Sequence, residues 1–321
     1  LFAGIGGTRI AFEKAGGQCV FTSEKDSYAL KTYTENFPDH AIYGDITAYD
    51  NNRKREIIPD HDVLVAGFPC QPFSLAGVSK NVSMARPHGF EHKTAGTMFG
   101  EILQILRLKK PRAFLLENVK NLAGHNKGDT FRVIKDSLGA GPDGLGYKVQ
   151  YRIYDAVKFV PQHRERIFIV GFLDDDEDGF DFDRIDTILE QRRRYKSLKS
   201  ILDDDPIESI SDGLFNALKN HKEKHLNRGN GFGYSVVDPE KRGTVTRTLS
   251  ARYYKDGAEI LIEMPGQNPR KLSPDECKRL MGFPKAFRFP VSDAQAYKQL
   301  GNSVVVPLVT VIAKEMATFL K

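Results

Sequence analysis

The chain has 321 residues, which suits two domains, and its hydrophobic (40%) and charged (28%) fractions are those of an ordinary globular protein. Its net charge of +5 favours a polyanionic partner without proving one. Three widely spaced cysteines without a C-x-x-C pair support neither a disulfide framework nor a zinc knuckle, and they fit a reducing cytoplasm. We find no 18-residue apolar run and no signal peptide. Leu1 stands inside an apparent strand, so we expect native residues to precede it.

Residues 1–7 predict a strand end that enters a glycine-rich turn and then a helix over residues 8–15. Gly4, Gly6 and Gly7 let the backbone approach a ligand closely at the start of that helix. The turn is not a G-x-G-x-x-G pattern and lacks the lysine of a P-loop, so it does not imply phosphate binding.

Two further strand ends carry acids. The strand over residues 19–23 ends at Glu24, and a third unit ends at Asp45. An acid at such a position accepts hydrogen bonds from a ribose in dinucleotide-binding folds. Glu24 and Asp45 are therefore candidate acceptors for ribose hydroxyls and an amino group, with Phe2 and Ile46 as apolar walls.

The apolar strand over residues 62–68 ends at a Pro-Cys-Gln-Pro turn that contains Cys70. The two prolines fix two φ angles and remove two donors, so Cys70 is held in a stiff loop. Functional residues of open α/β sheets lie just beyond the carboxyl ends of strands. Free cysteines are most often buried, however, so this turn alone leaves a structural and a reactive thiol equally open.

A long polar stretch over residues 75–97 follows, and loops of this length are functional lids or disordered tracts. His88 and His92 lie in it, but no Cys or carboxylate cluster accompanies them, so we expect no metal site. The next strand, residues 113–116, ends at Glu117, either a solvated acid or a proton donor. Functional groups thus recur at successive strand ends, which predicts one site along the carboxyl edge of a doubly wound sheet.

Arg164 and Arg166 stand at i and i+2 before a strand over residues 167–172. On extended backbone they point to the same side. Exposed arginines are usually solvated, but a pair in this position can clamp a phosphate or a carbonyl.

The composition changes after residue 172, and an acidic run leads us to interpret residues 173–185 as a linker. We therefore predict a catalytic and cofactor-binding domain over residues 1–172 plus about 280–321. A smaller, mostly β and loop-rich domain occupies about 173–279. Within it, residues 228–235 and 246–257 combine basic, aromatic and glycine residues, which suits contact with phosphates and base edges. Ordinary hairpin turns are the alternative.

Seven motifs stand in the order and spacing of the DNA cytosine-5 methyltransferases, and the chain resembles that family over essentially its whole length. They are residues 1–7, Glu24, Gly44-Asp45-Ile46, 67–71, 117–119, 162–166 and 301–305. The second domain resembles the Dcm group, whose members act within CCWGG in duplex DNA. The resemblance implies an α/β, doubly wound (Rossmann-like) S-adenosylmethionine-dependent methyltransferase domain with a smaller target-recognition domain.

The resemblance also implies a role for each matching residue. Cys70 is the nucleophile, Glu117 engages the cytosine edge, and Arg164 and Arg166 steady the base and the thiolate region. The S-adenosylmethionine pocket is bordered by Phe2, Ala3, Gly4, Gly6, Glu24, Asp45, Ile46, Pro69, Asn302 and Ser303. Contacts with DNA are expected from Gln71, Ser74, Arg228, Asn230, Arg252, Tyr253 and Lys255. Residues 75–97 match the family's mobile loop, and Lys25 replaces a frequent tryptophan that stacks on adenine.

We therefore predict methyl transfer from S-adenosylmethionine, leaving S-adenosylhomocysteine, to C5 of a flipped-out cytosine through a Cys70–C6 adduct. The predicted target is the second C of CCWGG. A catalytically idle DNA-binding relative and an RNA cytosine-5 methyltransferase are the alternatives. The catalytic set argues against the first, and the Dcm-like second domain against the second. We expect a cytoplasmic monomer of bacterial or phage type that binds double-stranded DNA, without a membrane, a metal or an obligate protein partner. A cognate restriction endonuclease is a candidate partner.

Overall fold

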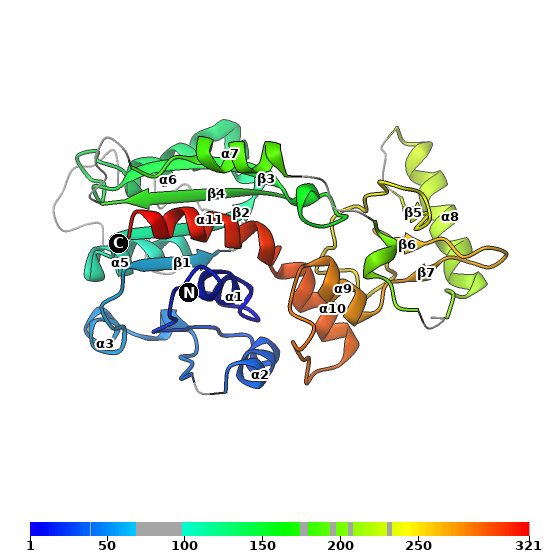
Figure 1. Ribbon diagram of the computed structural model, residues 1–321, viewed down its shortest axis with the longest axis horizontal. Coiled ribbons are helices and arrows are strands. Elements are labelled where there is room, and N and C mark those ends of the chain that lie inside the picture. The colour runs from blue at the N-terminus through cyan, green and yellow to red at the C-terminus, as the bar shows by residue number, and fades with distance from the viewer. Residues whose placement is uncertain are drawn as a thin grey trace.

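The computed structural model describes residues 1–38, 40–68, 98–173, 179–192, 197–204, 208–229 and 233–320. A larger part is built on a four-stranded sheet, and a smaller part holds a three-stranded sheet (Figure 1). Helices α9 (Pro274–Leu280) and α10 (Asp293–Asn302) lie between the two parts in this view.

The larger sheet is mixed, with the strand order β1-β2-β4-β3. β1 (Val63–Gly67) runs parallel to β2 (Ala113–Val119), whereas β4 (Glu165–Phe172) is antiparallel to both β2 and β3 (Lys148–Asp155). Gly67 is opposite Glu117, and Val119 is opposite Arg166. The carboxyl ends of β1 and β2 therefore meet the start of β4 at one edge of the sheet.

Three extended segments continue this sheet beyond β1, joined by only one or two backbone hydrogen bonds at each junction. The Leu1 amino group donates to the Val65 carbonyl (2.7 Å), and the Ala3 N–H donates to the Ser23 carbonyl (3.1 Å). Ser23 forms a parallel bridge with Tyr43. The N-terminal strands expected from the sequence are therefore present as extended backbone that is too sparsely paired to form full strands.

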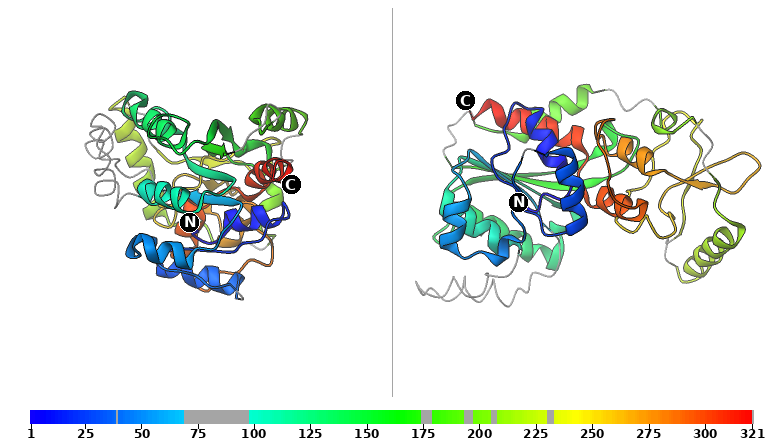
Figure 2. Two further views of the ribbon diagram at one scale, coloured as in Figure 1. Left: turned by 90° about the vertical axis from the view of Figure 1, so that its left-hand side faces the viewer. Right: turned by 90° about the horizontal axis from the view of Figure 1, so that it is seen from below.

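Helices cover both faces of the sheet, so the predicted doubly wound α/β class is confirmed (Figure 2). One face packs on α1 (Gly7–Glu13), α7 (Phe182–Gln191) and α11 (Val306–Thr318). The other packs on α5 (Met98–Lys109) and α6 (Asp129–Leu138), with α3 (Asn51–Ile57) against α5. Successive β2 residues alternate between the two cores, Leu115 facing the first and Leu116 the second.

The remaining short elements connect these layers. α2 (Ser27–Asn36) is capped by Asp26, whose carboxylate accepts from two backbone N–H groups. The 3₁₀ turns are η1 (Ile46–Ala48), η2 (Lys120–Leu122), η3 (His125–Gly128), η4 (Ala156–Lys158) and η5 (Lys199–Ile201).

Helix α7 falls inside the segment that the sequence assigned to the smaller domain. Its Phe182, Ile185 and Leu189 are buried in the core that also contains α11. The Tyr154 hydroxyl of β3 donates to Asp186 of α7 (2.8 Å). Because these contacts tie α7 to the larger sheet, we propose that the smaller domain begins after α7 instead of at residue 173.

The smaller part has little regular structure. Its strands β5 (Val236–Val237), β6 (Leu261–Ile262) and β7 (Arg270–Lys271) are two residues each, and α8 (Asp212–Leu226) is its long helix. A separate cluster of three buried residues, Ile210, Leu218 and Leu261, supports these elements. The loop-rich character expected for this domain is confirmed, with α8 in addition.

By length and composition alone, residues 293–318 are apolar enough to cross a membrane. They form two helices, α10 and α11, which extended backbone at Ser303 and Val305 separates. More than half of the most apolar window is buried inside the protein, as in the core helices of globular domains.

Candidate cofactor and catalytic site

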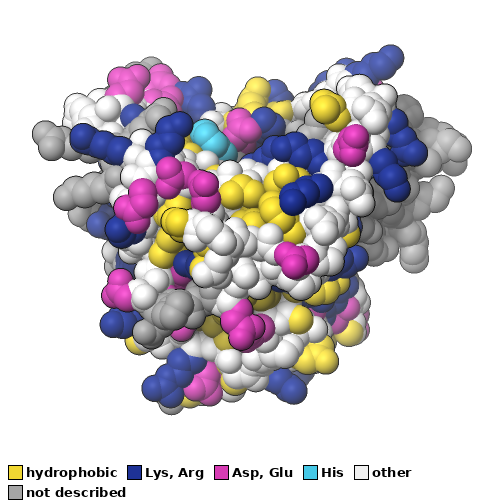
Figure 3. Space-filling model, turned by 90° about the vertical axis from the view of Figure 1, so that its right-hand side faces the viewer, with side chains coloured by type: hydrophobic (Ala, Val, Ile, Leu, Met, Phe, Trp, Pro, Cys, Tyr) yellow, Lys and Arg dark blue, Asp and Glu magenta, His cyan; other side chains and the backbone are white. Residues whose placement is uncertain are grey.

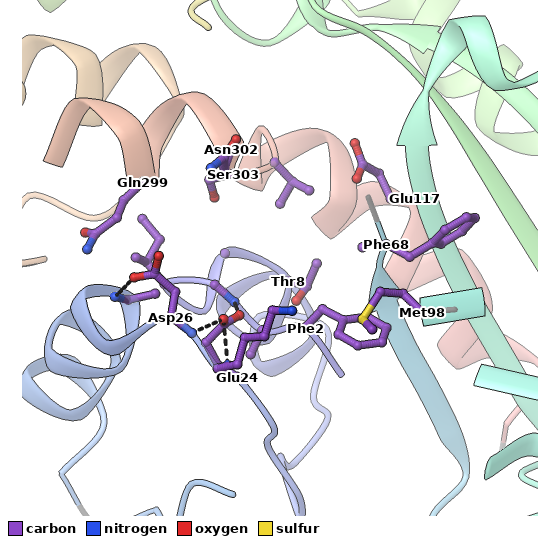
Figure 4. Close-up of a pocket in the computed structure, with 18 of the residues that line it drawn as sticks. Phe2, Thr8, Glu24, Asp26, Phe68, Met98, Glu117, Gln299, Asn302 and Ser303 are labelled. Atoms are coloured by element: carbon purple, nitrogen blue, oxygen red, sulfur yellow. Dashed lines mark hydrogen bonds between the residues drawn. The ribbon is translucent and has the colours of Figure 1, made fainter. Parts of the chain in front are cut away.

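A cavity of about 520 Å³ opens at the edge of the sheet where β1 and β2 end. Its walls come from the N-terminal segments, the ends of β1 and β2, the start of β4, and α10 (Figure 4). The predicted site residues that line it are Phe2, Ala3, Gly4, Glu24, Asp45, Ile46, Glu117, Arg164, Arg166, Asn302 and Ser303. The structure therefore gathers in one place groups that are as far apart as 300 residues in the sequence.

Glu24 is held in a fixed orientation by backbone donors. Its Oε2 accepts from the Gly4 N–H (2.7 Å), and its Oε1 accepts from the N–H groups of Lys25 and Asp26 (2.8 Å each). Gly4 has φ +54° and no atom within 4 Å of the place where a Cβ would stand. Phe2, with φ 52°, is a non-glycine residue in the left-handed region, a strain that clusters at functional sites.

Asp45 begins η1 as its cap. Its Oδ1 accepts from the Thr47 N–H (3.0 Å) and the Thr47 hydroxyl (2.8 Å). These hydrogen bonds, with the nearby Lys25, lower the pKa of the Asp45 carboxyl against the effect of burial. Asp45 is therefore an ionised acceptor at neutral pH, next to the buried Ile46.

Gly6 is not among the residues that line the cavity, although Gly4 and Gly7 on either side of it are. It precedes α1 with φ +85°, and an added Cβ would lie 2.4 Å from the Phe37 ring. Gly6 is thus needed for a turn and for close packing against α2.

Glu117 and Arg166 form an ion pair at the end of the cavity where β2 and β4 meet. The Arg166 Nε lies 3.0 Å from Glu117 Oε1, and the two side chains are only 17% and 15% exposed. Burial raises the pKa of the Glu117 carboxyl, although Arg166 and Arg164 oppose that effect. Glu117 therefore keeps its proton to a higher pH than an ordinary glutamate.

Asn118 fixes the ends of the two central strands to each other. Its Nδ2 donates to the Phe68 carbonyl (2.9 Å), and its Oδ1 accepts from the Val119 N–H (2.8 Å). Phe68 directly follows β1, so the side chain of Asn118 holds the backbone next to Glu117 in register.

Arg164 has different partners from Arg166, although both line the cavity. It is 2% exposed, and its guanidinium donates to the carbonyls of Leu249 (2.8 Å), Gly301 (2.8 Å) and Ser303 (2.5 Å). Burial and the neighbouring Arg166 lower the pKa of this group, but a guanidinium stays charged at neutral pH. The described contacts of Arg164 are thus with backbone, not with a catalytic side chain.

Among the residues predicted to contact DNA, Arg228, Arg252 and Lys255 are exposed on the smaller part. Lys and Arg side chains are prominent on that end of the molecule (Figure 3). The prediction for Tyr253 is wrong because its side chain is fully buried. Its hydroxyl donates to the Ile260 carbonyl (2.7 Å) and accepts from the Leu272 N–H (2.8 Å).

Several residues of the prediction lie outside the described residues. They are Pro69, Cys70, Gln71, Ser74, Asn230 and the loop over residues 75–97. In the described ranges, no group of three or more His, Cys, Asp or Glu side chains gathers as a metal site would require.

The sequence analysis missed one wall of the cavity, which is formed by Gln295, Lys298 and Gln299 of α10. They lie on the same helix face as Asn302, at spacings of three and four residues. This three- and four-residue spacing was a signal that could have found them.

The family profile described as "C-5 cytosine-specific DNA methylase" matches residues 1–318. The "DNA-cytosine methyltransferase" of Escherichia coli K12 is 45% identical over 98% of this chain and 76% of its own length. "Type II methyltransferase M.NlaX" of Neisseria lactamica is 48% identical over 98% of this chain and 94% of its own. The solved structure of the Schizosaccharomyces pombe Dnmt2 methyltransferase shares the fold, with a TM-score of 0.75, 19% identity and coverage of 99% and 96% of the two chains.

Proposed function

The chain belongs to the C-5 cytosine-specific DNA methylase family and is a DNA (cytosine-5-)-methyltransferase, and we propose that it modifies a flipped-out cytosine in duplex DNA through a covalent adduct between Cys70 and C6. The observation that carries this proposal is the partly buried Glu117–Arg166 pair at the end of the cavity. A DNA-binding relative without activity would have no need of this pair.

The family uses S-adenosylmethionine, and the residues of the cavity fit that molecule. The oriented carboxylate of Glu24 suits a ribose diol, and Asp45 suits an amino group. Phe2 and Ile46 provide apolar walls, and the open Gly4 leaves room for a close approach. When bound, S-adenosylmethionine supplies the methyl group as an electrophile on a sulfonium sulfur.

The protein's own residues make C5 of the cytosine reactive. The Cys70 thiolate adds to C6, and the electron pair released from the C5–C6 double bond turns the ring into an enamine. In this proposal Glu117, whose pKa burial raises, donates a hydrogen bond to N3 and offsets the charge that develops on the ring. Arg166 holds the carboxyl of Glu117 in place. Once C5 carries the methyl group, a base removes the C5 proton and the thiolate leaves; we assign no side chain to that base.

The target atom is inaccessible in a stacked duplex, so the cytosine must leave the helix, at a cost of a few kcal/mol. We propose the second C of CCWGG as the target, on the basis of the 45% identity to the E. coli enzyme. The exposed Arg228, Arg252 and Lys255 are our candidates for reading the site. We further propose that the protein is a cytoplasmic monomer.

Bisulfite sequencing tests activity and target together. Plasmid DNA would be recovered from a host that lacks cytosine-5 methylation and expresses either this chain or its C70S variant. We expect protection of the second C of CCWGG with the wild-type chain and none with C70S. Protection at another sequence would refute only the target, whereas equal protection by C70S would refute the mechanism.

A duplex with 5-fluorocytosine at the target tests the covalent step directly. Fluorine at C5 cannot leave as a proton, so the adduct with Cys70 should persist and survive denaturing electrophoresis. C70S should form no adduct. Absence of an adduct with an active wild-type enzyme would contradict attack at C6.

A further inference from the structure

The chain that leads into β4 is joined to the smaller part by a run of hydrogen bonds. The Thr246 N–H donates to the Pro161 carbonyl (2.8 Å), and the His163 N–H donates to the Thr246 carbonyl (3.0 Å). The Leu249 N–H then donates to the buried side chain of Gln162 (2.7 Å). These bonds end directly before residues 250–257, which we call the recognition segment.

Arg164 extends this junction to a third element. One of its terminal nitrogens donates to Leu249, and the other donates to Gly301 and Ser303. Gly301 and Ser303 belong to residues 301–304, which we call the cofactor loop because all four line the cavity. A planar guanidinium can donate to these separate carbonyls at once, whereas the compact ammonium of a lysine cannot match that geometry.

Gly301 brings the two segments into direct backbone contact. A Cβ built on Gly301 would lie 2.3 Å from the carbonyl carbon and oxygen of Ser250 and 2.4 Å from the Ala251 nitrogen. No side chain fits between them, so a shift of the cofactor loop must displace the start of the recognition segment.

The same residues also connect to the catalytic carboxyl. Arg164 stands two positions before Arg166, which pairs with Glu117. The start of β4 is therefore a common anchor for the cofactor loop, the recognition segment and the catalytic pair.

We propose that Arg164 is a positioning residue that couples occupancy of the cofactor cavity to the placement of the recognition segment. This inference rests on the proposed function, since it takes the cavity as the cofactor site and residues 250–257 as part of the DNA-reading surface. A ligand that orders one segment lowers the cost of ordering the other, which gives positive coupling. Each ligand must then raise the affinity for the other by the same factor.

The test measures the dissociation constant of a fluorescently labelled duplex with and without saturating S-adenosylhomocysteine. The duplex carries the site that bisulfite sequencing identifies. For the wild-type chain we expect S-adenosylhomocysteine to tighten duplex binding by about 5- to 150-fold, the usual range of allosteric coupling. In R164K this factor should fall several-fold, because the hydrogen bonds that join the two segments are lost, and by reciprocity the effect of the duplex on S-adenosylhomocysteine affinity should fall by the same factor.

R112K is the matched control because the Arg112 guanidinium also donates to two backbone carbonyls, those of Phe319 and Leu320, away from the cavity. It should keep the wild-type factor. G301A keeps Arg164 but forces the two segments apart, so it should lose the coupling as well and serves as the test if R164K does not fold.

The outcomes separate this inference from the proposed function. A wild-type chain that binds neither S-adenosylhomocysteine nor the duplex would refute the proposed function. If the wild-type chain binds S-adenosylhomocysteine and the duplex but neither affects the affinity for the other, the proposed role of Arg164 is overturned and the proposed function stands. A folded R164K that keeps the wild-type factor would overturn it equally.

Discussion

The two parts of the molecule hold their functional side chains in opposite ways. In the larger part, Glu24 and Glu117 stand at the ends of extended segments, fixed by backbone hydrogen bonds or by a partly buried arginine. In the smaller part, Arg228, Arg252 and Lys255 are exposed, and the buried Tyr253 beside Arg252 belongs to the same core as α11. The proposed chemistry thus lies on the well-packed sheet edge, and the proposed recognition lies on exposed side chains, which can change with little effect on packing.

This difference predicts two kinds of mutational effect. Substitutions at the sheet edge should change turnover or cofactor affinity on every DNA sequence alike. Substitutions on the exposed loops should change which sequence is methylated, or the affinity for DNA in general. A sheet-edge substitution that changes which sequence is methylated would contradict this difference. So would a loop substitution that lowers turnover on every DNA sequence alike.

The largest effect is expected for E117Q. Glutamine fills the same space but cannot share a proton with N3 of the cytosine, so kcat should fall by roughly 10²- to 10⁴-fold, the usual contribution of a general acid. Duplex affinity should stay near wild type. E56Q is the control, since Glu56 is an exposed carboxylate paired with Arg53. Normal kcat in E117Q would remove Glu117 from the chemistry.

The pH dependence of kcat/KM sharpens this prediction. The active form of Glu117 is protonated, so activity should fall as pH rises through its pKa. Because burial raises that pKa, the fall should come at a higher pH than for an ordinary glutamate. Arg166 lowers the pKa, so R166Q should move the fall to still higher pH, while E117Q should lack it. A shift to lower pH in R166Q would contradict the assigned electrostatics.

A smaller effect is expected for E24Q, at the cofactor end of the same edge. Glutamine replaces one of the two carboxylate oxygens with an NH₂ group, which cannot accept from the backbone N–H groups that now hold that oxygen and pairs poorly with a ribose diol. Losing a hydrogen bond to a charged group costs about 1.5–3 kcal/mol, so KM for S-adenosylmethionine should rise roughly 10- to 150-fold. Steady-state kinetics should show little change in kcat. An unchanged KM would exclude Glu24 from the cofactor site.

Much of this edge could be predicted from the sequence because its signals are local. Apolar runs that end at Glu24 and Glu117 identify strand ends. The helix spacing of Phe182, Ile185 and Leu189 was equally visible. The acidic run before them led us to assign α7 to the smaller domain, whereas its buried contacts favour the larger part.

Long-range contacts could not be predicted in this way. Arg164 donates to carbonyls that are 85 and 137 residues away, and no property of its own segment specifies those partners. Tyr253 lies in a turn without periodicity, so the sequence did not show which of its neighbours faces inward. Both the contacts of Arg164 and the burial of Tyr253 lie at the junction between the two parts, where local patterns carry least information.

On the exposed side of the comparison, R252A should relax specificity. A bidentate arginine–guanine contact discriminates by about 1–3 kcal/mol, so the ratio of kcat/KM between the cognate duplex and one with a replaced G·C pair should fall roughly 5- to 150-fold. K255A is the matched control for an exposed cation. A lysine on a phosphate should weaken binding to all duplexes alike and lower the salt slope by about one. If R252A instead weakens binding to all duplexes alike, as we expect of K255A, then Arg252 contacts the DNA backbone and not a base.

The smallest effect on methylation is expected for Y253F, next to Arg252 in the sequence. Its loss of the hydroxyl leaves the Ile260 carbonyl and the Leu272 N–H buried without a partner, which costs about 1–3 kcal/mol of folding stability. The melting temperature should therefore fall while the sequence preference stays at the wild-type value. Adjacent residues would then separate the two roles within one turn, with Arg252 reading DNA and Tyr253 holding the turn against α10. A Y253F variant with normal stability and altered sequence preference would show that this segment rearranges to expose Tyr253 when it meets DNA.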